Sequence, residues 1–407
     1  MKRTILMIGA GIEQVPGIET AHRMGLRVVT ADGNPQAPGF KHADDRLVAS
    51  TYDIEKTMAF ASEYNKKKRI DGVITVGADV PLTVASVAHE LGLPGISLEA
   101  ARLASDKLAM KDRFAACGVP IPWFREVKSP AELKDVATEM GFPLVLKPVD
   151  SRGARGVLRL TKGVDLVWAF ETALKHSPYQ RVMVEEFLAG PQLSTESLVY
   201  DGQVFTPGFT DRNYELLEKL SPYIIENGGQ MPSILPQAER EKVEKLIASA
   251  AAAMGIERGI VKGDIVVTEE GPKVIELAAR LSGGWFATDQ IPLSTGVNLV
   301  KEAINIALGE EPDFEKLKPA YHRGVAIRYL FPLPGKVKEV TGLEGVLKLP
   351  WVERAMVTIK AGDVIDQITD HTRRVGFVIV SAPDREIAVR RAEKAIKLIN
   401  IEVEAAQ

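Results

Sequence analysis

Residues 261–284, VKGDIVVTEEGPKVIELAARLSGG, constrain the fold of this chain more than any other stretch. A turn-forming run, TEEGP, separates two apolar runs, which is typical of a β-hairpin. With the turn centred near Glu270, Asp264 and Glu276 lie opposite each other across the two strands. Side chains alternate along a strand, so the face that carries Glu276 is also expected to carry Arg280. The hairpin is therefore expected to gather two acids and an arginine on one polar face.

Two carboxylates that face each other across an antiparallel pair repel, unless a positive charge lies between them. Mg²⁺ binds carboxylate oxygens and leaves coordination sites for water and substrate phosphates, as in ATP-consuming enzymes. Mn²⁺ is the alternative ion. An acidic hairpin on a solvated surface is the alternative interpretation of the same residues, and only other parts of the chain can decide between the two.

The composition predicts a soluble globular protein that acts on small molecules. A chain of 407 residues with 45% hydrophobic residues is expected to form about two to four domains. A net charge of −3 gives no electrostatic case for nucleic acid or a membrane as the partner. The single cysteine, Cys117, excludes an internal disulfide and fits the cytoplasm. The apolar run after Met1 is interpreted as a buried strand rather than a signal peptide.

Strands and helices alternate over the first ninety or so residues, which predicts a parallel sheet. Gly9 and Gly11 follow the first strand, and Asp32 follows about twenty residues later, so a dinucleotide-binding oxidoreductase has to be considered. Gln14 stands where the third glycine of that fingerprint is expected, which argues against NAD. The carboxyl ends of these strands are unspecific candidates for substrate contacts.

A second unit is expected to begin near residue 115. Lys147 ends the buried strand predicted at 143–148, and the glycine- and arginine-rich turn DSRGARGV follows at 150–157. That turn lacks the Gly-Lys-Ser/Thr ending of a Walker loop. A further strand at 181–188 carries two acids and is closed by Gly-Pro, so the chain is expected to bend there as a hinge.

These pieces in this order resemble the ATP-grasp superfamily. They are similar to its carboxylate–amine ligase type, which includes biotin carboxylase, phosphoribosylglycinamide synthetase and L-amino acid ligases. The resemblance covers residues 1–310. In that family two α+β subdomains clamp ATP, and a preceding α/β domain helps to bind substrate. A carboxylate is activated as an acyl phosphate and is then attacked by an amine. The resemblance implies an ADP-forming ligase that uses ATP and Mg²⁺ on small-molecule carboxylates and amines.

The resemblance also implies roles for individual residues. Lys147 and Arg280 are the expected catalytic residues, and Asp264 and Glu276 are the expected metal ligands. The expected ATP contacts are Lys107, Lys147, Ser151, Gly153, Gly156, Glu185, Glu186, Leu188 and Gln192.

Two positions depart from the family pattern. Gln192 stands where a ribose-binding glutamate is common, and Ala278 replaces the usual asparagine beside the metal acids. The second departure implies that a second magnesium is held more weakly or through water. A noncatalytic ATP-binding or sensing protein, which keeps the clamp without the reaction, is therefore an alternative function.

The substrate segments are less specific. Asp211 or Glu226 is a candidate to hold an amine, and Arg212 is a candidate to hold a carboxylate. Ordinary polar residues on the protein surface would give the same sequence pattern. Lys262 is expected either to reach a phosphate or to pair with an acid. The backbone amides of Gly283 and Gly284 are candidates to hold the acyl phosphate. These residues do not distinguish an amino-acid ligase from a carboxylase that makes carboxyphosphate from bicarbonate.

The predicted fold class is α/β and α+β multidomain. Its parts are an N-terminal parallel-sheet domain (1–114), an ATP-grasp domain (115–312, with a lid at 119–189) and a small α+β domain (313–407). Similar C-terminal domains in the family cover the active site or form a dimer contact, so a homodimer is one of the two expectations for this part of the chain.

Overall fold

Two units make up the computed structural model, which describes residues 2–404. The first unit comprises Met1–Ile121, Leu193–Phe209 and Leu235–Tyr321, and the second comprises Pro122–Gln192, Thr210–Ile234 and His322–Gln407. Residue 1 of the predicted N-terminal domain and residues 405–407 of the predicted C-terminal domain lie outside the described residues.

A parallel sheet with the strand order β3-β2-β1-β4 opens the first unit. Its central strand is buried along its whole length, because the apolar run that forms it is covered on both faces. The elements of this part are β1 (Thr4–Ile8), α1 (Val15–Arg23), β2 (Arg27–Asp32), β3 (Asp45–Val48), α2 (Ile54–Lys67), β4 (Gly72–Ile74), α3 (Pro81–Glu90), α4 (Leu98–Ser105) and α5 (Lys107–Ala116).

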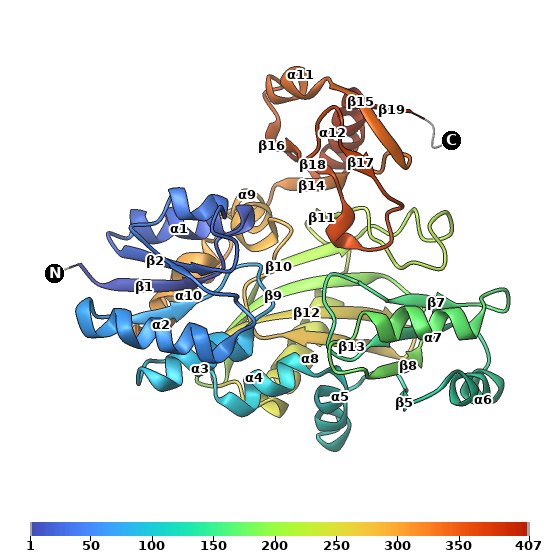
Figure 1. Cartoon of the computed structure of the whole chain (residues 1–407), viewed down its shortest axis with the longest axis horizontal. Coiled ribbons are helices and arrows are strands. Elements are labelled where there is room, and N and C mark those ends of the chain that lie inside the picture. Colours follow the sequence, from blue (N-terminus) through green and yellow to red (C-terminus); the bar gives the residue numbers. More distant parts are fainter. Residues whose placement is uncertain (1, 405–407) are drawn as a thin grey trace. The chain divides into compact units, whose positions relative to one another are not determined.

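The rest of the first unit is built on antiparallel strands in the order β13-β12-β9-β10. Helix α8 packs against β12 and β13 (Figure 1), and its alanine-rich apolar face fills the core beneath them. The elements are β9 (Gln192–Tyr200), β10 (Gln203–Arg212), α8 (Gln237–Ala253), β12 (Arg258–Thr268), β13 (Gly271–Ala278), α9 (Ile291–Thr295) and α10 (Leu299–Ala307).

The β12–β13 hairpin confirms the expected register but contains a bulge. Thr268 pairs with Gly271 across a two-residue turn, and Asp264 pairs directly with Glu276. The pairing then steps from Glu276 to Val274, so Ile275 is an extra residue on β13. A bulge of this kind breaks the strict alternation of faces. As a result Val274 and Leu277, three residues apart, are both fully buried.

The second unit begins with an antiparallel sheet in the order β5-β8-β6-β7. Helices α6 and α7 pack together, and their apolar faces lie in the same hydrophobic cluster as this sheet. The elements are β5 (Phe124–Val127), α6 (Pro130–Met140), β6 (Leu144–Pro148), β7 (Leu158–Leu160), α7 (Leu166–Lys175) and β8 (Val182–Glu186).

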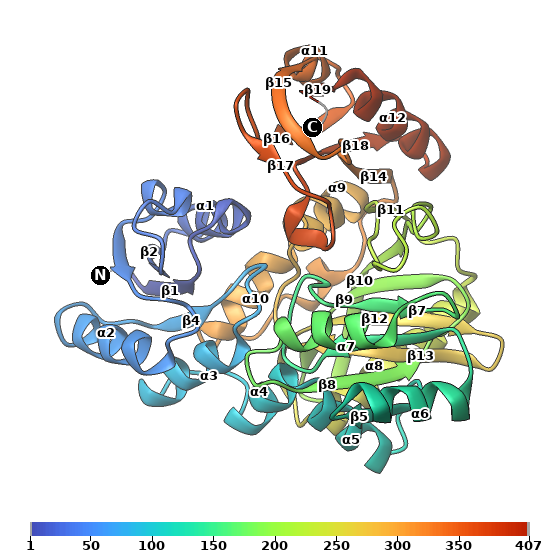
Figure 2. The ribbon, with the colours of Figure 1, turned by 45° about the vertical axis from the view of Figure 1, so that its right-hand side comes forward.

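The C-terminal part of the second unit has strands in the order β11-β14-β18-β16 and a small sheet, β17-β15-β19. Helix α12 packs on β14 and β18 (Figure 2) through small side chains that allow a close approach. The elements are β11 (Gly229–Met231), β14 (Gly324–Tyr329), β15 (Gly335–Thr341), α11 (Leu343–Leu347), β16 (Val352–Val357), β17 (Val364–Ile365), β18 (Gly376–Ala382), α12 (Arg385–Leu398) and β19 (Asn400–Glu404).

The predicted fold class is confirmed: a parallel N-terminal sheet is followed by antiparallel sheets with helices packed on them and by a C-terminal part that again combines strands and helices. The strands of this C-terminal part alternate with helices α11 and α12, as expected for a small α+β domain. Between residues 2 and 404, the helices are all too short or too polar to cross a bilayer.

Candidate active site

The hairpin of the first unit carries the expected acid pair, and each acid has a lysine beside it. Lys262 Nζ donates to Asp264 Oδ2, and Ser194 Oγ donates to Asp264 Oδ1 at 2.9 Å. Lys107, at the start of α5, lies with its Nζ 3.6 Å from Glu276 Oε2. Of the two expectations for Lys262, the structure therefore shows pairing with an acid.

Asp264 and Glu276 fit a hard divalent cation. Two carboxylates side by side supply part of an octahedral shell, and Mg²⁺ bound in this way keeps waters and takes up substrate phosphates. Residues 2–404 hold no cluster of three or more acids, histidines or cysteines that would form an all-protein metal cage. The lysines beside the pair offset its repulsion in the absence of metal.

Arg280 lies in the bend after β13, because the strand ends at Ala278. It therefore does not continue the strand face of Glu276 as the sequence predicted. Its Nε is 3.4 Å from Asp79 Oδ1, near the end of a parallel-sheet strand. Burial lowers the pKa of Arg280, but the carboxylates of Asp79, Glu196, Glu276 and Asp264 outweigh burial and raise the pKa above its ordinary value. The guanidinium is a fixed positive charge.

Sequence reasoning missed Glu196 on β9. Its carboxylate is completely buried, accepts a hydrogen bond from the Ser282 backbone N–H at 2.9 Å and is also bonded to Ser282 Oγ. Burial raises the pKa of Glu196 to about 7, although the Ser282 bonds and the charge of Arg280 oppose this shift. Glu196 fixes the turn that follows Arg280. Glu196 is the one charged residue of β9, whose other polar residues are uncharged, and this was the only sequence feature that pointed to it.

The Ser282–Gly284 turn is held by carboxylates of the chain itself. Gly284 N–H donates to Glu13 Oε2 at 3.0 Å, and a Cβ placed on Gly283 would lie 2.5 Å from the same oxygen. The next residue, Trp285, is buried with a left-handed φ of 61° and begins a π-helical turn, Phe286–Gln290. Backbone strain of this kind occurs at functional sites. The backbone amides of Gly283 and Gly284 were predicted to bind an acyl phosphate. In the structure, the amide of Gly284 donates to Glu13, and that of the neighbouring Ser282 donates to Glu196.

In the second unit, Lys147 and Glu185 form a buried ion pair. The two side chains come from neighbouring strands, β6 and β8, and Lys147 Nζ lies 2.5 Å from Glu185 Oε1. Each side chain is only 4% exposed. A buried lysine that is paired with one acid is held in a fixed position, and its ammonium group can also contact a bound anion.

The predicted flap, Ser151 to Gly156, is a tight turn between β6 and β7. Gly153 and Gly156 have positive φ angles of 64° and 72°, which glycine adopts without strain. A Cβ on Gly156 would lie 2.9 Å from Pro148 and 3.0 Å from His176. A hollow of about 360 Å³ beside this turn is lined by Asp150, Ser151, Arg152, Arg155, Lys175, His176, Ser177, Pro178 and Gln180.

The predicted adenine hinge follows β8. Glu186 is exposed, its backbone N–H donates to the Trp123 carbonyl at 2.9 Å, and Leu188 lies half-buried in the loop after it. Gln192, the expected ribose contact, begins β9 at the end of that loop. The backbone N–H of Glu186 is therefore already bonded, whereas Leu188 lies outside the regular strands.

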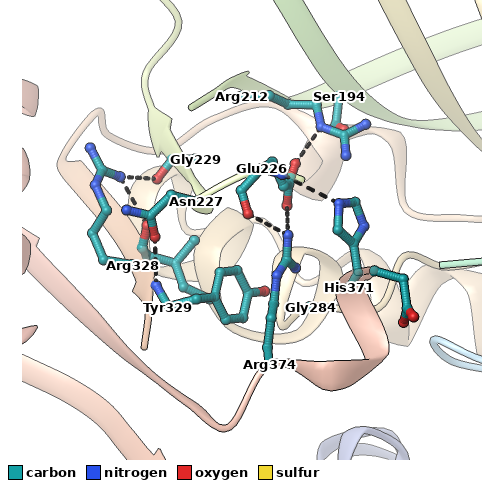
Figure 3. Close-up of polar contacts among 12 residues, drawn as sticks. Ser194, Arg212, Glu226, Asn227, Gly229, Gly284, Arg328, Tyr329, His371 and Arg374 are labelled. Carbon is teal, nitrogen blue, oxygen red and sulfur yellow. Dashed lines mark hydrogen bonds and ion pairs between the residues drawn. The ribbon is translucent and has the colours of Figure 1, made fainter. Parts of the chain in front are cut away.

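The predicted substrate residues of the second unit are paired with arginines. Asp211 Oδ2 lies 2.7 Å from Arg385 Nη1, and Arg212 is bonded to Glu226 (Figure 3). Both acids are thus paired with arginines of the chain itself, while Asp211 Oδ1 is buried and has no hydrogen-bond partner among residues 2–404.

The glycine loop of the N-terminal sheet is filled by a side chain. A Cβ on Gly11 would lie 2.8 Å from Gln14 Oε1, and Gln14 Nε2 donates to the Val76 carbonyl. Asp32 accepts bonds from the backbone N–H groups of Ala10 and Asn34, both at 2.8 Å. The residues expected to hold a dinucleotide are thus engaged with one another.

Three family models match successive parts of the chain. An ATP-grasp N-terminal domain matches residues 18–95, the ATP-grasp (A) domain of phosphoribosylglycinamide synthetase matches residues 105–283, and the C-terminal domain 2 of L-amino acid ligases matches residues 328–404.

Among curated proteins, the uncharacterized protein y4rH of Sinorhizobium fredii is 26% identical over 392 residues, which cover 94% of this chain and 79% of that protein. The D-alanine–D-alanine ligase of an Azoarcus species is 28% identical over 234 residues, which cover 56% of this chain and 74% of that protein.

Solved structures show the same fold. The L-amino acid ligase of Bacillus licheniformis superposes with a TM-score of 0.83 at 22% identity, with 99% of each chain covered. Phosphoribosylglycinamide synthetase of Anaerococcus prevotii gives a TM-score of 0.75 at 19% identity over 99% of this chain and 100% of that one. A third is the biotin carboxylase domain dimer of Hydrogenobacter thermophilus 2-oxoglutarate carboxylase, solved with MgADP. It gives a TM-score of 0.74 at 21% identity over 99% of this chain and 91% of that one.

These matches support neither the oxidoreductase nor the noncatalytic sensor. The ordered pieces found in the sequence, the fold built from them and three consecutive family matches agree. The chain belongs to the ATP-grasp superfamily and is of its ATP-dependent carboxylate–amine ligase type.

Proposed function

We propose that this ligase joins the carboxylate of an amino acid, or of a similar small metabolite, to the amine of a second one. The match to an L-amino acid ligase domain at residues 328–404 and the similarity to D-alanine–D-alanine ligases support this substrate class. The observation that carries the proposal is the Asp264–Glu276 pair with Lys107, Lys262 and Arg280 around it.

The reaction has two steps. A carboxylate oxygen of the first substrate attacks the γ-phosphorus of ATP, the bond to the β-phosphate oxygen breaks, and an acyl phosphate and ADP form. The amine of the second substrate then attacks the acyl carbon, phosphate leaves, and the nitrogen loses a proton. The first step brings two anions together, so positive charge that is in place beforehand lowers its barrier.

Each proposed role follows from the chemistry of the residue. Lys147 and Lys107 bind ATP phosphates, and Ser151, Gly153 and Gly156 close over them through backbone N–H groups. Glu185 orients Lys147 through their buried pair. The loop with Glu186, Leu188 and Gln192 binds adenine and ribose.

Asp264 and Glu276 would hold Mg²⁺. When bound, Mg²⁺ neutralises charge on the phosphates. Arg280, held in the bend by Asp79 and beside the turn fixed by Glu196, binds the carboxylate and the transferred phosphoryl group through its guanidinium.

Hydroxylamine trapping tests the acyl phosphate. Wild-type protein with ATP, Mg²⁺ and hydroxylamine is screened against single amino acids, small carboxylates and bicarbonate, and hydroxamates are detected by mass spectrometry. We expect an amino-acid hydroxamate that requires ATP and is absent with Glu276→Gln. ATP turnover that requires bicarbonate and yields no amino-acid hydroxamate would favour the carboxylase instead. No product with any carboxylate, despite measurable ATP binding, would contradict the proposal.

A further inference from the structure

Two arginines from distant parts of the second unit meet on one glutamate. Arg212 is bonded to Glu226 Oε2, and Arg374, 148 residues away in the chain, donates from Nη2 to the Glu226 carbonyl at 2.6 Å. The same Nη2 is 3.4 Å from Glu226 Oε1. Figure 3 shows both guanidinium groups and the His371 ring converging on Glu226. We call Arg212, Glu226 and Arg374 the arginine cluster.

The arginine cluster carries an excess positive charge. His371 Nε2 accepts a bond from the Glu226 backbone N–H at 3.4 Å. Glu215, three residues after Arg212, accepts from Asn227 at 2.6 Å, and its charge acts on Arg328. Within the arginine cluster, two guanidinium groups contact one carboxylate. The balance of about +1 matches one carboxylate better than a phosphate dianion.

Arg374 is rigid and incompletely bonded. Its guanidinium lies 3.9 Å from the centre of the Tyr329 ring, which covers one face of the group and fixes its plane. The side chain is 10% exposed, and its buried Nε has no hydrogen-bond partner among residues 2–404. A buried N–H donor without an acceptor is costly, and a side-on carboxylate is the acceptor that fits the guanidinium fork.

The loop that carries Arg374 also contacts the flap. The backbone N–H of His371 donates to the Gly153 carbonyl at 3.0 Å, and a Cβ placed on Gly153 would lie 3.0 Å from Thr372. The arginine cluster is thus tied, within one unit, to the turn proposed to cover the ATP phosphates.

We propose that Arg212 and Arg374 bind a free carboxylate of the substrate, one that is not the carboxylate activated by ATP. Glu226 holds the two arginines in place and does not bind an amine. The proposal rests on the ligase function proposed above and adds a substrate requirement to it. The free carboxylate belongs either to the amine-bearing amino acid or to the side chain of the activated one.

The first experiment compares acids with their neutral amides as substrates. ADP release is measured for wild type, Arg374→Gln and the matched control Arg373→Gln, whose side chain is 45% exposed and points to Asp366. In one arm the amine substrate is replaced by its α-carboxamide, and in the other an acidic activated substrate is replaced by its side-chain amide. The arm in which the amide lowers ADP release identifies the substrate that carries the free carboxylate.

In that arm we expect the amide to raise the wild-type KM about tenfold or more. We expect Arg374→Gln to raise the KM for the acid by a similar factor and to leave the KM for the amide unchanged, because the interaction is then already absent. Arg374→Lys keeps the positive charge but lacks the guanidinium fork, so its KM for the acid should lie between the values for wild type and Arg374→Gln. Arg373→Gln should match wild type. Equal losses with acid and amide would show a merely structural role and overturn the proposal.

A binding measurement separates this proposal from the ligase reaction. L-Glutamate and its two monoamides, L-glutamine and L-isoglutamine, are titrated calorimetrically into the full chain with a nonhydrolysable ATP analogue. Each monoamide keeps one carboxylate, so the carboxylate assigned to Arg280 is retained in one of them. We expect that monoamide to bind more weakly than L-glutamate to wild type and to Arg373→Gln, and this preference to be absent in Arg374→Gln. A preference that survives Arg374→Gln, or none in wild type, would overturn the carboxylate site even if the ligase reaction were established. The expected preference without any ADP release would leave this site standing and contradict the ligase reaction alone.

Discussion

Carboxylates lie among basic side chains in both units, but in opposite proportions. In the first unit Asp264, Glu276, Asp79 and Glu196 surround Lys107, Lys262 and Arg280. In the second unit two arginines, Arg212 and Arg374, contact one glutamate, Glu226. The sign of the local net charge decides whether a site attracts a cation or an anion, because a charged side chain that is removed from water needs a charge of the opposite sign beside it.

The adjacent carboxylates of Asp264 and Glu276 in the first unit therefore fit a divalent cation, and the two adjacent guanidinium groups of the second unit fit an anion. It follows that removal of an acid should have different consequences in the two places. In the hairpin, removal of an acid should lower catalytic activity and leave the fold intact. In the arginine cluster it should cost stability.

The largest effect is expected for Glu276→Gln. The variant keeps the size of the side chain and removes half of the charge that would bind Mg²⁺, so ADP release should fall by about 10³-fold. The midpoint of urea unfolding should stay close to that of wild type, because the lost contact with Lys107 is long, at 3.6 Å, and one like-charge repulsion disappears. Activity assays and urea titrations of the same preparation check both parts.

Glu226→Gln should lower the free energy of unfolding by about 3–4 kcal/mol, since it removes the carboxylate that both nearly buried guanidinium groups contact. The matched control is Glu218→Gln, which removes an 81% exposed acid from Arg159 in the same unit and should cost less than about 1 kcal/mol. Equal urea midpoints for the two variants would contradict the charge count of the arginine cluster.

Glu196 gives the third prediction, a pH dependence of stability. Its pKa is raised to about 7 from an ordinary 4.5, so the folded state binds the proton more tightly than the unfolded state. The contribution of Glu196 to stability is thus fully present below pH 4.5 and is lost as pH rises to about 7, by about 3 kcal/mol.

In Glu196→Gln this loss should disappear, so the variant gains stability relative to wild type between pH 5 and pH 8. Urea unfolding at both pH values measures the difference. A constant difference between variant and wild type would show that Glu196 does not titrate in this range.

The smallest effect is expected for Asp201→Asn, which breaks the exposed ion pair with Arg258 on the surface of the first unit. Solvent screens both groups, so the urea midpoint should not change measurably. A clear shift here would mean that exposed pairs contribute more than the account allows, and it would weaken the contrast with Glu226.

Local sequence patterns were sufficient for the parts of the site that lie close together in the chain. The turn residues placed Asp264 opposite Glu276, and apolar runs identified the strands that carry Lys147 and Glu185. The bulge at Ile275 was not visible, because an extra residue in a strand changes no composition. The end of β13 at Ala278, which leaves Arg280 in a bend, was not visible either.

Contacts between distant segments were beyond sequence reasoning. Glu196 meets Ser282 across 86 residues, and Arg374 meets Glu226 across 148. Pairing of this kind depends on strand order in the sheets, which no spacing rule supplies. The roles given to the individual site residues and the boundaries of the three predicted domains remain predictions.

The most direct test of the central claim is ADP release by the purified protein with ATP and Mg²⁺, screened across pairs of carboxylates and amines with Glu276→Gln beside every pair. The account predicts release that requires one carboxylate and one amine, yields their amide and is lost in the variant. Release that persists in Glu276→Gln, or that needs no amine, would contradict it.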